Sequence, residues 1–127
     1  MIVVDASAAL SALLNAGEAR AALGRQQIHV PHLIDAEIAG ALRRRVVTGD
    51  VAEGAGLTAL RQWRKLGLTR YTGYPLLERI WELRHNMSAY DATYIALAET
   101  LGTSLLTADR RLGRAPGARC PITLVPR

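Results

Sequence analysis

Short apolar runs alternate along the chain with longer stretches in which apolar residues recur every three or four positions. The short runs predict five strands, at residues 2–4, 28–30, 69–71, 104–106 and 122–125. The longer stretches predict six helices, at residues 7–14, 18–24, 33–47, 50–66, 75–83 and 88–101. Strands that alternate with crossover helices build a mostly parallel sheet covered on both faces. We therefore expect an α/β fold with about five short strands.

The whole chain, residues 1–127, is expected to form one domain, because no repeat, linker or low-complexity tract divides it. No stretch approaches the ~20 apolar residues of a membrane helix. The apolar N-terminus lacks a basic lead-in and is interrupted by Asp5, so it is interpreted as part of the fold. The single cysteine, Cys120, excludes an internal disulfide and a cysteine-built zinc site. A cytoplasmic protein without membrane association is expected.

The chain carries a formal charge of +5, and Lys65 is the only lysine among its 16 basic residues. Arginine binds phosphate oxygens through two parallel hydrogen bonds, so an arginine-rich basic domain favours nucleic acid as a partner. A GC-rich genome, which favours arginine over lysine codons, explains the same composition. Charge alone does not separate these two explanations.

Two aspartates directly follow predicted strands. Asp5 follows the first strand and Asp109 follows the fourth. Parallel sheets bind ligands beyond the carboxyl ends of their strands, at the point where strand order reverses. If the first and fourth strands are neighbours there, both carboxylates enter the same crevice. Each residue could equally be an N-cap, because aspartate accepts hydrogen bonds from the free N–H groups of a helix.

Glu37 lies on the apolar side of its predicted helix. At about 100° per residue it falls between Leu33 and Ala41, inside the hydrophobic stripe. An ionised carboxylate is rarely buried without a partner. An internal salt bridge is one explanation, and a functional acid that faces a crevice is the other.

Asp91 shows the same conflict between burial and charge. Ser88 and Asp91 have the spacing of a capping box, which would explain the acid locally. The helix that follows is apolar almost all round, and Asp91 shares a face with Ile95 and Ala98. A carboxylate again points where hydrophobic side chains belong.

Four acids gathered in one crevice would repel one another unless a cation neutralised them. Ligands that are all oxygen suit Mg²⁺ or Mn²⁺, with positions left for water and a substrate phosphate. Such an ion can activate water for phosphodiester hydrolysis. The three histidines do not have the arrangement of a zinc site and are expected to be surface or structural residues.

The residues around these acids resemble a PIN domain, and more narrowly the VapC ribonuclease toxins of bacterial type II toxin–antitoxin pairs. The resemblance covers the whole chain. Its most specific part is Ser88–Glu99, with the sequence SAYDATYIALAE, and the other parts are Asp5–Ser7, Glu37 and Leu106–Asp109. It implies a PIN-like three-layer sandwich.

The resemblance also implies an activity. The implied activity is that of a metal-dependent endoribonuclease. In it, Asp5, Glu37, Asp91 and Asp109 would be both the catalytic residues and the ligands of one or two Mg²⁺ or Mn²⁺ ions. Water activated by the metal would leave 5′-phosphate and 3′-hydroxyl ends. Ser7 and Thr107 match family positions where a hydroxyl orients an acid or a water. The implied partners are a cognate VapB-type antitoxin, a second copy in a homodimer, and an RNA substrate (tRNA, rRNA or mRNA).

Arginines flank two of the acids. Residues 43–45 end the helix of Glu37, where basic side chains are favoured by the helix dipole. Arg110 and Arg111 begin a segment where cations are disfavoured, so we interpret them as RNA-phosphate contacts. The alternative to the ribonuclease is a catalytically silent PIN-like module that binds RNA or protein. A phosphatase or receiver domain is disfavoured, because both normally need a lysine near the phosphate.

Overall fold

The computed structural model describes residues 1–127 and contains a five-stranded sheet in which every neighbouring pair is parallel. The strand order is β3-β2-β1-β4-β5. The strands are β1 (Ile2–Val4), β2 (Ile28–Pro31), β3 (Leu68–Tyr71), β4 (Leu105–Thr107) and β5 (Ile122–Leu124). Strand order reverses between β1 and β4, which are direct neighbours. This is the switch point at which open α/β sheets bind ligands.

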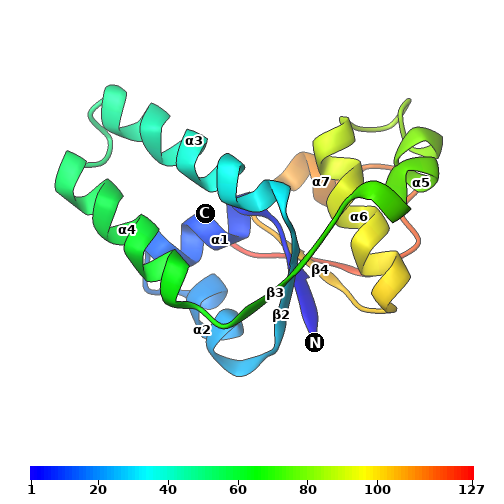
Figure 1. The fold of residues 1–127 in the computed structure, drawn as a ribbon, viewed down its shortest axis with the longest axis horizontal. Coiled ribbons are helices and arrows are strands. Elements are labelled where there is room, and N and C mark those ends of the chain that lie inside the picture. The colour runs from blue at the N-terminus through cyan, green and yellow to red at the C-terminus, as the bar shows by residue number, and fades with distance from the viewer.

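Helices cover both faces of the sheet (Figure 1). On one side lie α1 (Ala6–Leu14), α2 (Glu18–Arg25), α3 (Leu33–Val47) and α4 (Glu53–Lys65). The other side holds a 3₁₀ turn (Tyr74–Leu76), α5 (Leu77–Glu82) and α6 (Ala89–Leu101), and a short α7 (Arg110–Arg114) contacts β4 and β5. The predicted three-layer α/β sandwich is confirmed.

Three details of the helices differ from the prediction. The helix expected at 50–66 begins at Glu53, because Gly49 takes a positive φ of 84° and the following residues form the turn after α3. The helix expected at 75–83 begins with a 3₁₀ turn around Pro75. Helix α7 was not predicted, since its five residues are too few to show a helical period.

The core is one cluster of 29 buried hydrophobic residues. Helix α6 supplies an uninterrupted buried run from Ala92 to Ala98. Ser88 caps its start, and Gly102, with φ of 65°, closes its end in the left-handed conformation. No helix combines the length and the apolar composition that crossing a membrane requires.

Asp35 fixes α3 against the rest of the fold. Its carboxylate accepts a hydrogen bond from Trp63 Nε1 of α4 at 2.7 Å and from Arg70 of β3 at 2.8 and 2.9 Å. The Arg70 guanidinium holds the pKa of Asp35 below its usual value. The pair is part-exposed and contributes modestly to stability. It sets the orientation of α3, and with it the position of Glu37 two residues later.

Candidate active site

Asp5 sits at the end of β1 and is held by three donors. Its Oδ1 accepts from Ser7 Oγ at 2.7 Å and from Ala8 N at 2.9 Å, and its Oδ2 accepts from Thr107 Oγ1 at 2.5 Å. Ser7 Oγ in turn accepts from Ala108 N at 2.9 Å. Asp5 is therefore the N-cap of α1, as the alternative explanation expected. The two hydroxyls, from opposite sides of the β1–β4 junction, also fix its carboxylate in one orientation.

Glu37 points from α3 toward α6. Its Oε1 accepts a hydrogen bond from the hydroxyl of Tyr94, at 2.5 Å. It forms no salt bridge, so the internal ion pair considered for it is absent. Burial raises the pKa of Glu37, and the charges of Asp91 and Asp5 raise it further against the lowering effect of the Tyr94 bond.

Asp91 lies in the first turn of α6 with its carboxylate free. Ser88 Oγ accepts from the backbone N–H of Asp91 at 3.2 Å, but the Asp91 side chain returns no hydrogen bond to Ser88. Only half of the expected capping box therefore forms. Burial, and next the charge of Asp109, raise the pKa of Asp91. The Ser88 hydroxyl and the charge of Arg111 lower the pKa of this half-buried carboxylate and only partly offset those effects.

Asp109 follows β4 and is the N-cap of α7. Its carboxylate accepts from the backbone N–H of Arg111 at 2.9 Å and from the Arg111 guanidinium at 3.1 Å. Burial alone would raise the pKa of Asp109, but these bonds outweigh it and hold the pKa below its usual value. Asp109 is thus the one acid of the four that is paired with an arginine.

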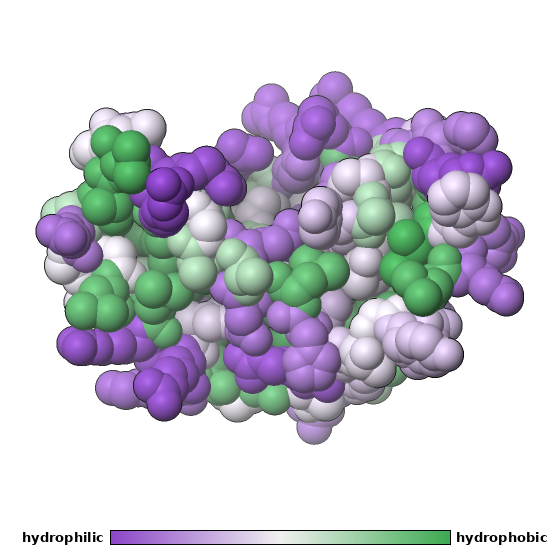
Figure 2. Space-filling view, turned by 45° about the horizontal axis from the view of Figure 1, so that its top comes forward, coloured by the Kyte–Doolittle hydropathy of each residue, from purple (hydrophilic) through white to green (hydrophobic).

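The four acids lie near enough to one another, around the carboxyl ends of β1 and β4, for their charges to interact. Burial raises the pKa of Asp5 first, and the charge of Asp91 adds to it. The charges of Asp91 and Asp5 likewise raise the pKa of Glu37, and the charge of Asp109 raises the pKa of Asp91. Such mutual repulsion arises only between carboxylates that lie near one another. Seen toward this edge, the surface is hollowed and bordered by hydrophilic side chains (Figure 2).

The chemistry of these donors fits a hard divalent cation. All are carboxylate oxygens, and in three of them the pKa is raised first by burial and then by the charge of a neighbouring acid. No three acidic, histidine or cysteine side chains lie close enough to form a single ligand cluster. Mg²⁺ usually keeps several waters and is held by only one or two carboxylates, so spaced acids of this kind suit it.

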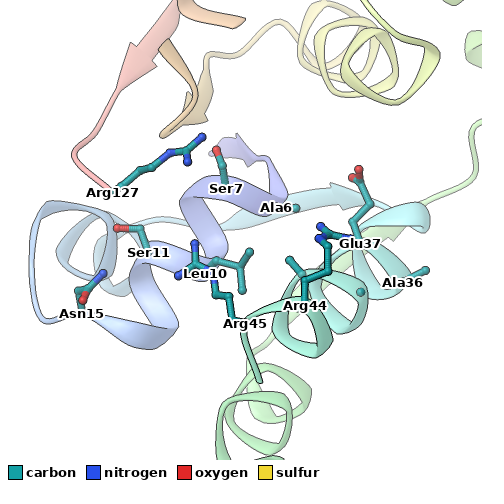
Figure 3. A pocket seen from close by; sticks show the side chains of 12 residues that line it. Ala6, Ser7, Leu10, Ser11, Asn15, Ala36, Glu37, Arg44, Arg45 and Arg127 are labelled. Atoms are coloured by element: carbon teal, nitrogen blue, oxygen red, sulfur yellow. The ribbon is translucent and has the colours of Figure 1, made fainter. Parts of the chain in front are cut away.

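A groove of about 610 Å³ runs from Glu37 and Ser7 between α1 and α3 (Figure 3). A second hollow, which shares Arg127 with this groove, is lined by Asp109, Arg110 and Arg111. Of the two arginines predicted to contact RNA, Arg111 donates to Asp109 while its side chain stays 87% exposed, and Arg110 is exposed with no carboxylate partner.

Tyr94 is the site residue that the sequence did not indicate. Only 1% of it is exposed, and in sequence it is one more apolar residue of α6. Its position three residues after Asp91 was the available signal, because residues three apart share a helix face. A buried tyrosine hydroxyl also needs a partner, and Glu37 provides it.

Comparison with known proteins identifies the fold and the family. Residues 2–118 match the PIN domain family. Ribonuclease VapC9 of Mycobacterium tuberculosis is 56% identical over 127 residues, which cover 100% of both chains. The crystal structure of PAE2754 from Pyrobaculum aerophilum matches with a TM-score of 0.74 and 26% identity, covering 95% of this chain and 81% of that one. VapBC2 from Rickettsia felis, solved with a DNA fragment from its promoter, matches with a TM-score of 0.65 and 12% identity over 97% of this chain and 98% of that one, which shows the fold alone. The chain therefore belongs to the PIN domain family, among the VapC ribonucleases.

Proposed function

We propose that this protein is a metal-dependent endoribonuclease toxin that hydrolyses RNA phosphodiester bonds. The observation that carries the proposal is a set of oriented acids at the switch point of the sheet: Ser7 and Thr107 hold Asp5, Tyr94 holds Glu37, and Asp91 lies near enough to act on both. Membership of the VapC ribonucleases supports RNA as the substrate.

In the proposed reaction the oxygen of a water bonds to phosphorus while the bond from phosphorus to the 3′-oxygen breaks and that oxygen gains a proton. The products are a 5′-phosphate and a 3′-hydroxyl. Mg²⁺ or Mn²⁺ would bind among Asp5, Glu37, Asp91 and Asp109, each ion held by one or two of these carboxylates, and would supply charge neutralisation at the phosphate and lower the pKa of water. Ser7 and Thr107 orient Asp5, and Tyr94 orients Glu37, so these carboxylates need little rearrangement during the reaction.

Incubation of the purified protein with total RNA tests the activity directly. We expect discrete cleavage products with Mg²⁺ or Mn²⁺ and none in EDTA, because the acids alone repel phosphate. End-labelling should find 5′-phosphates. Equal product formation in EDTA would contradict the metal-dependent mechanism.

Thermal unfolding tests the metal site without any need for activity. We expect Mn²⁺ or Mg²⁺ to raise the melting temperature of the wild type, because binding to the folded state alone stabilises it, by about 2.7 kcal/mol at a hundredfold excess over Kd. The Asp91→Asn variant should show no such rise. Equal shifts in both proteins would remove Asp91 from the site.

Tyr94→Phe tests the role of the hydroxyl on Glu37. Loss of a hydrogen bond to a charged group should lower the rate of cleavage about tenfold. The acid limb of the pH–rate profile should also move to higher pH, since the Tyr94 bond lowers the pKa of Glu37 and its loss lets that pKa rise. Tyr71→Phe is the matched control, because it also removes a tyrosine hydroxyl bond, at 2.7 Å, but one made to His29 and not to an acid. Identical profiles for both variants would show that the hydroxyl has no catalytic role.

A VapB-type antitoxin and a second copy of the chain are part of the proposal. The VapBC2 neighbour supports an antitoxin as partner. Tyr74, Leu77, Trp81 and Tyr90 are large side chains that are exposed around α5 and the start of α6. An apolar surface of this kind favours contact with another protein, and we assign it to the homodimer. The competing function, a silent module that binds RNA or protein, predicts binding without cleavage in the same total-RNA experiment.

A further inference from the structure

The groove between α1 and α3 carries three arginines beside the acidic site. Arg44 and Arg45 come from α3, and Arg127 comes from beyond β5. In Figure 3 the guanidinium of Arg127 lies beside Ser7, and Arg45 extends from α3 toward α1. Three positive side chains thus border a trough that opens directly onto Glu37.

These arginines have no anionic partner within the chain. The structure's ion pairs use Arg70, Arg79 and Arg111, and neither Arg44 nor Arg45 donates a side-chain hydrogen bond. Arg127 makes one long contact, from Nε to the carbonyl oxygen of Ala108 at 3.5 Å. The donors of this groove are therefore available to an anion.

The spacing along α3 places Arg44 in register with the acid. Seven residues correspond to about two helical turns, or ~10 Å, so Arg44 and Glu37 share a face. The Arg44 guanidinium folds back over Gly40, where a Cβ would lie 3.6 Å from it. It is near enough for its charge to lower the pKa of Glu37. A glycine between the two leaves the floor of the groove open.

We propose that Arg44, Arg45 and Arg127 form a phosphate-binding groove that holds the RNA backbone on one side of the scissile bond. The inference rests on the proposed ribonuclease function and adds to it the residues that position the strand. Guanidinium groups bind phosphate through paired hydrogen bonds. Only four of the twelve lining residues are hydrophobic, so the groove fits an RNA strand better than an apolar protein segment.

Binding of a fluorescent single-stranded RNA, followed by anisotropy in EDTA over a series of salt concentrations, tests the groove without metal or turnover. Arg44→Ala, Arg45→Ala and Arg127→Ala should each weaken binding about five- to tenfold and reduce the slope of log affinity against log salt by about 0.7 per lost phosphate contact. Arg43→Ala is the matched control, because Arg43 has the same charge on the same helix but is exposed outside the groove. It should change affinity by less than about twofold.

Equal weakening by Arg43→Ala would show that only net charge matters and would overturn the groove. Competition by polyglutamate as effective as that by RNA would also overturn it, in favour of an acidic protein segment as the occupant. If the wild type cleaves RNA and the Arg44→Ala/Arg45→Ala double variant binds RNA with normal affinity, the groove is refuted. The proposed ribonuclease activity is then still supported. RNA binding through the groove without cleavage would refute the ribonuclease and support the groove.

Discussion

Asparagine in place of Asp91 is expected to lower RNA cleavage by about 100-fold or more, the usual loss when one preorganised catalytic group is removed. The N-cap of α6 is Ser88 rather than Asp91, so the substitution removes charge without removing the cap. In EDTA the same variant should melt at a higher temperature than the wild type. The raised pKa of Asp91 means that its ionised form destabilises the folded state once the pH exceeds that pKa, and asparagine carries no charge.

Asp50→Asn provides the control for this result. Asp50 is an exposed acid in the turn after α3, far along the helix from Glu37, and its loss should change cleavage by no more than about twofold. Cleavage assays and melting curves in EDTA on the three proteins complete the test. An Asp91→Asn protein that cleaves RNA at the wild-type rate would exclude Asp91 from catalysis, whatever its effect on stability.

Replacing Arg79 by alanine should have the largest effect on stability, a loss of roughly 3 kcal/mol in the free energy of unfolding. Arg79 of α5 donates to Glu99 of α6 at 2.7 and 3.1 Å, and to the carbonyl oxygen of Gly117 at 2.7 Å. The two side chains are only 17% and 13% exposed. Without Arg79 a largely buried carboxylate is left with the backbone N–H of Arg119 as its one remaining donor.

The pH dependence of this loss follows from Glu99. Burial would raise the pKa of Glu99, but the bonds from Arg79 and Arg119 outweigh it and hold the pKa below its ordinary value of 4.5. Its stabilising contribution is therefore full above pH 4.5 and disappears as the pH falls through the lowered pKa. The free energies of unfolding of the wild type and Arg79→Ala, measured in urea, should differ at neutral pH and converge in acid.

Arg84→Ala is a suitable control, because Arg84 is exposed and stacks over Trp81 with its guanidinium carbon 4.5 Å from the ring centre. Its loss should cost about 1 kcal/mol or less. The double variant Arg79→Ala/Glu99→Gln should recover part of the stability, since it no longer buries an unpaired charge. If Arg79→Ala and Arg84→Ala lose the same free energy of unfolding, the buried Arg79–Glu99 pair contributes no more to stability than an exposed arginine does.

The sequence predicted the architecture because the strands and most helices carry their own periodic signals. It predicted Asp5 and Asp109 as site residues because parallel sheets bind ligands beyond the carboxyl ends of their strands. It could not predict α7, which depends on the Asp109 cap rather than on a pattern. Nor could it fix the start of α4, because the turn at Gly49 depends on how α3 and α4 pack.

On the helices, site residues could be predicted only where they broke a local rule. Glu37 and Asp91 were visible as charges on apolar helix faces. Tyr94 breaks no rule, since tyrosine is common in cores, and only the structure shows its bond to Glu37. The helix dipole explains the charge run at 43–45 in the sequence, but in the structure its second and third members, Arg44 and Arg45, share a groove with Glu37. The predicted metal-binding and catalytic roles of the acids stay predictions until the experiments above are done.

The hydrogen bonds on Asp5 have a consequence for synthesis. One hydroxyl, from Ser7, is two residues away, but the other, from Thr107, is 102 residues away and becomes available only when β4 has paired with β1. Long-range pairing of this kind forms late in folding. A ribosome-bound chain that has not yet exposed β4 therefore has an incompletely oriented Asp5. The order in which the protein emerges delays completion of its active site until nearly all of the domain has been translated.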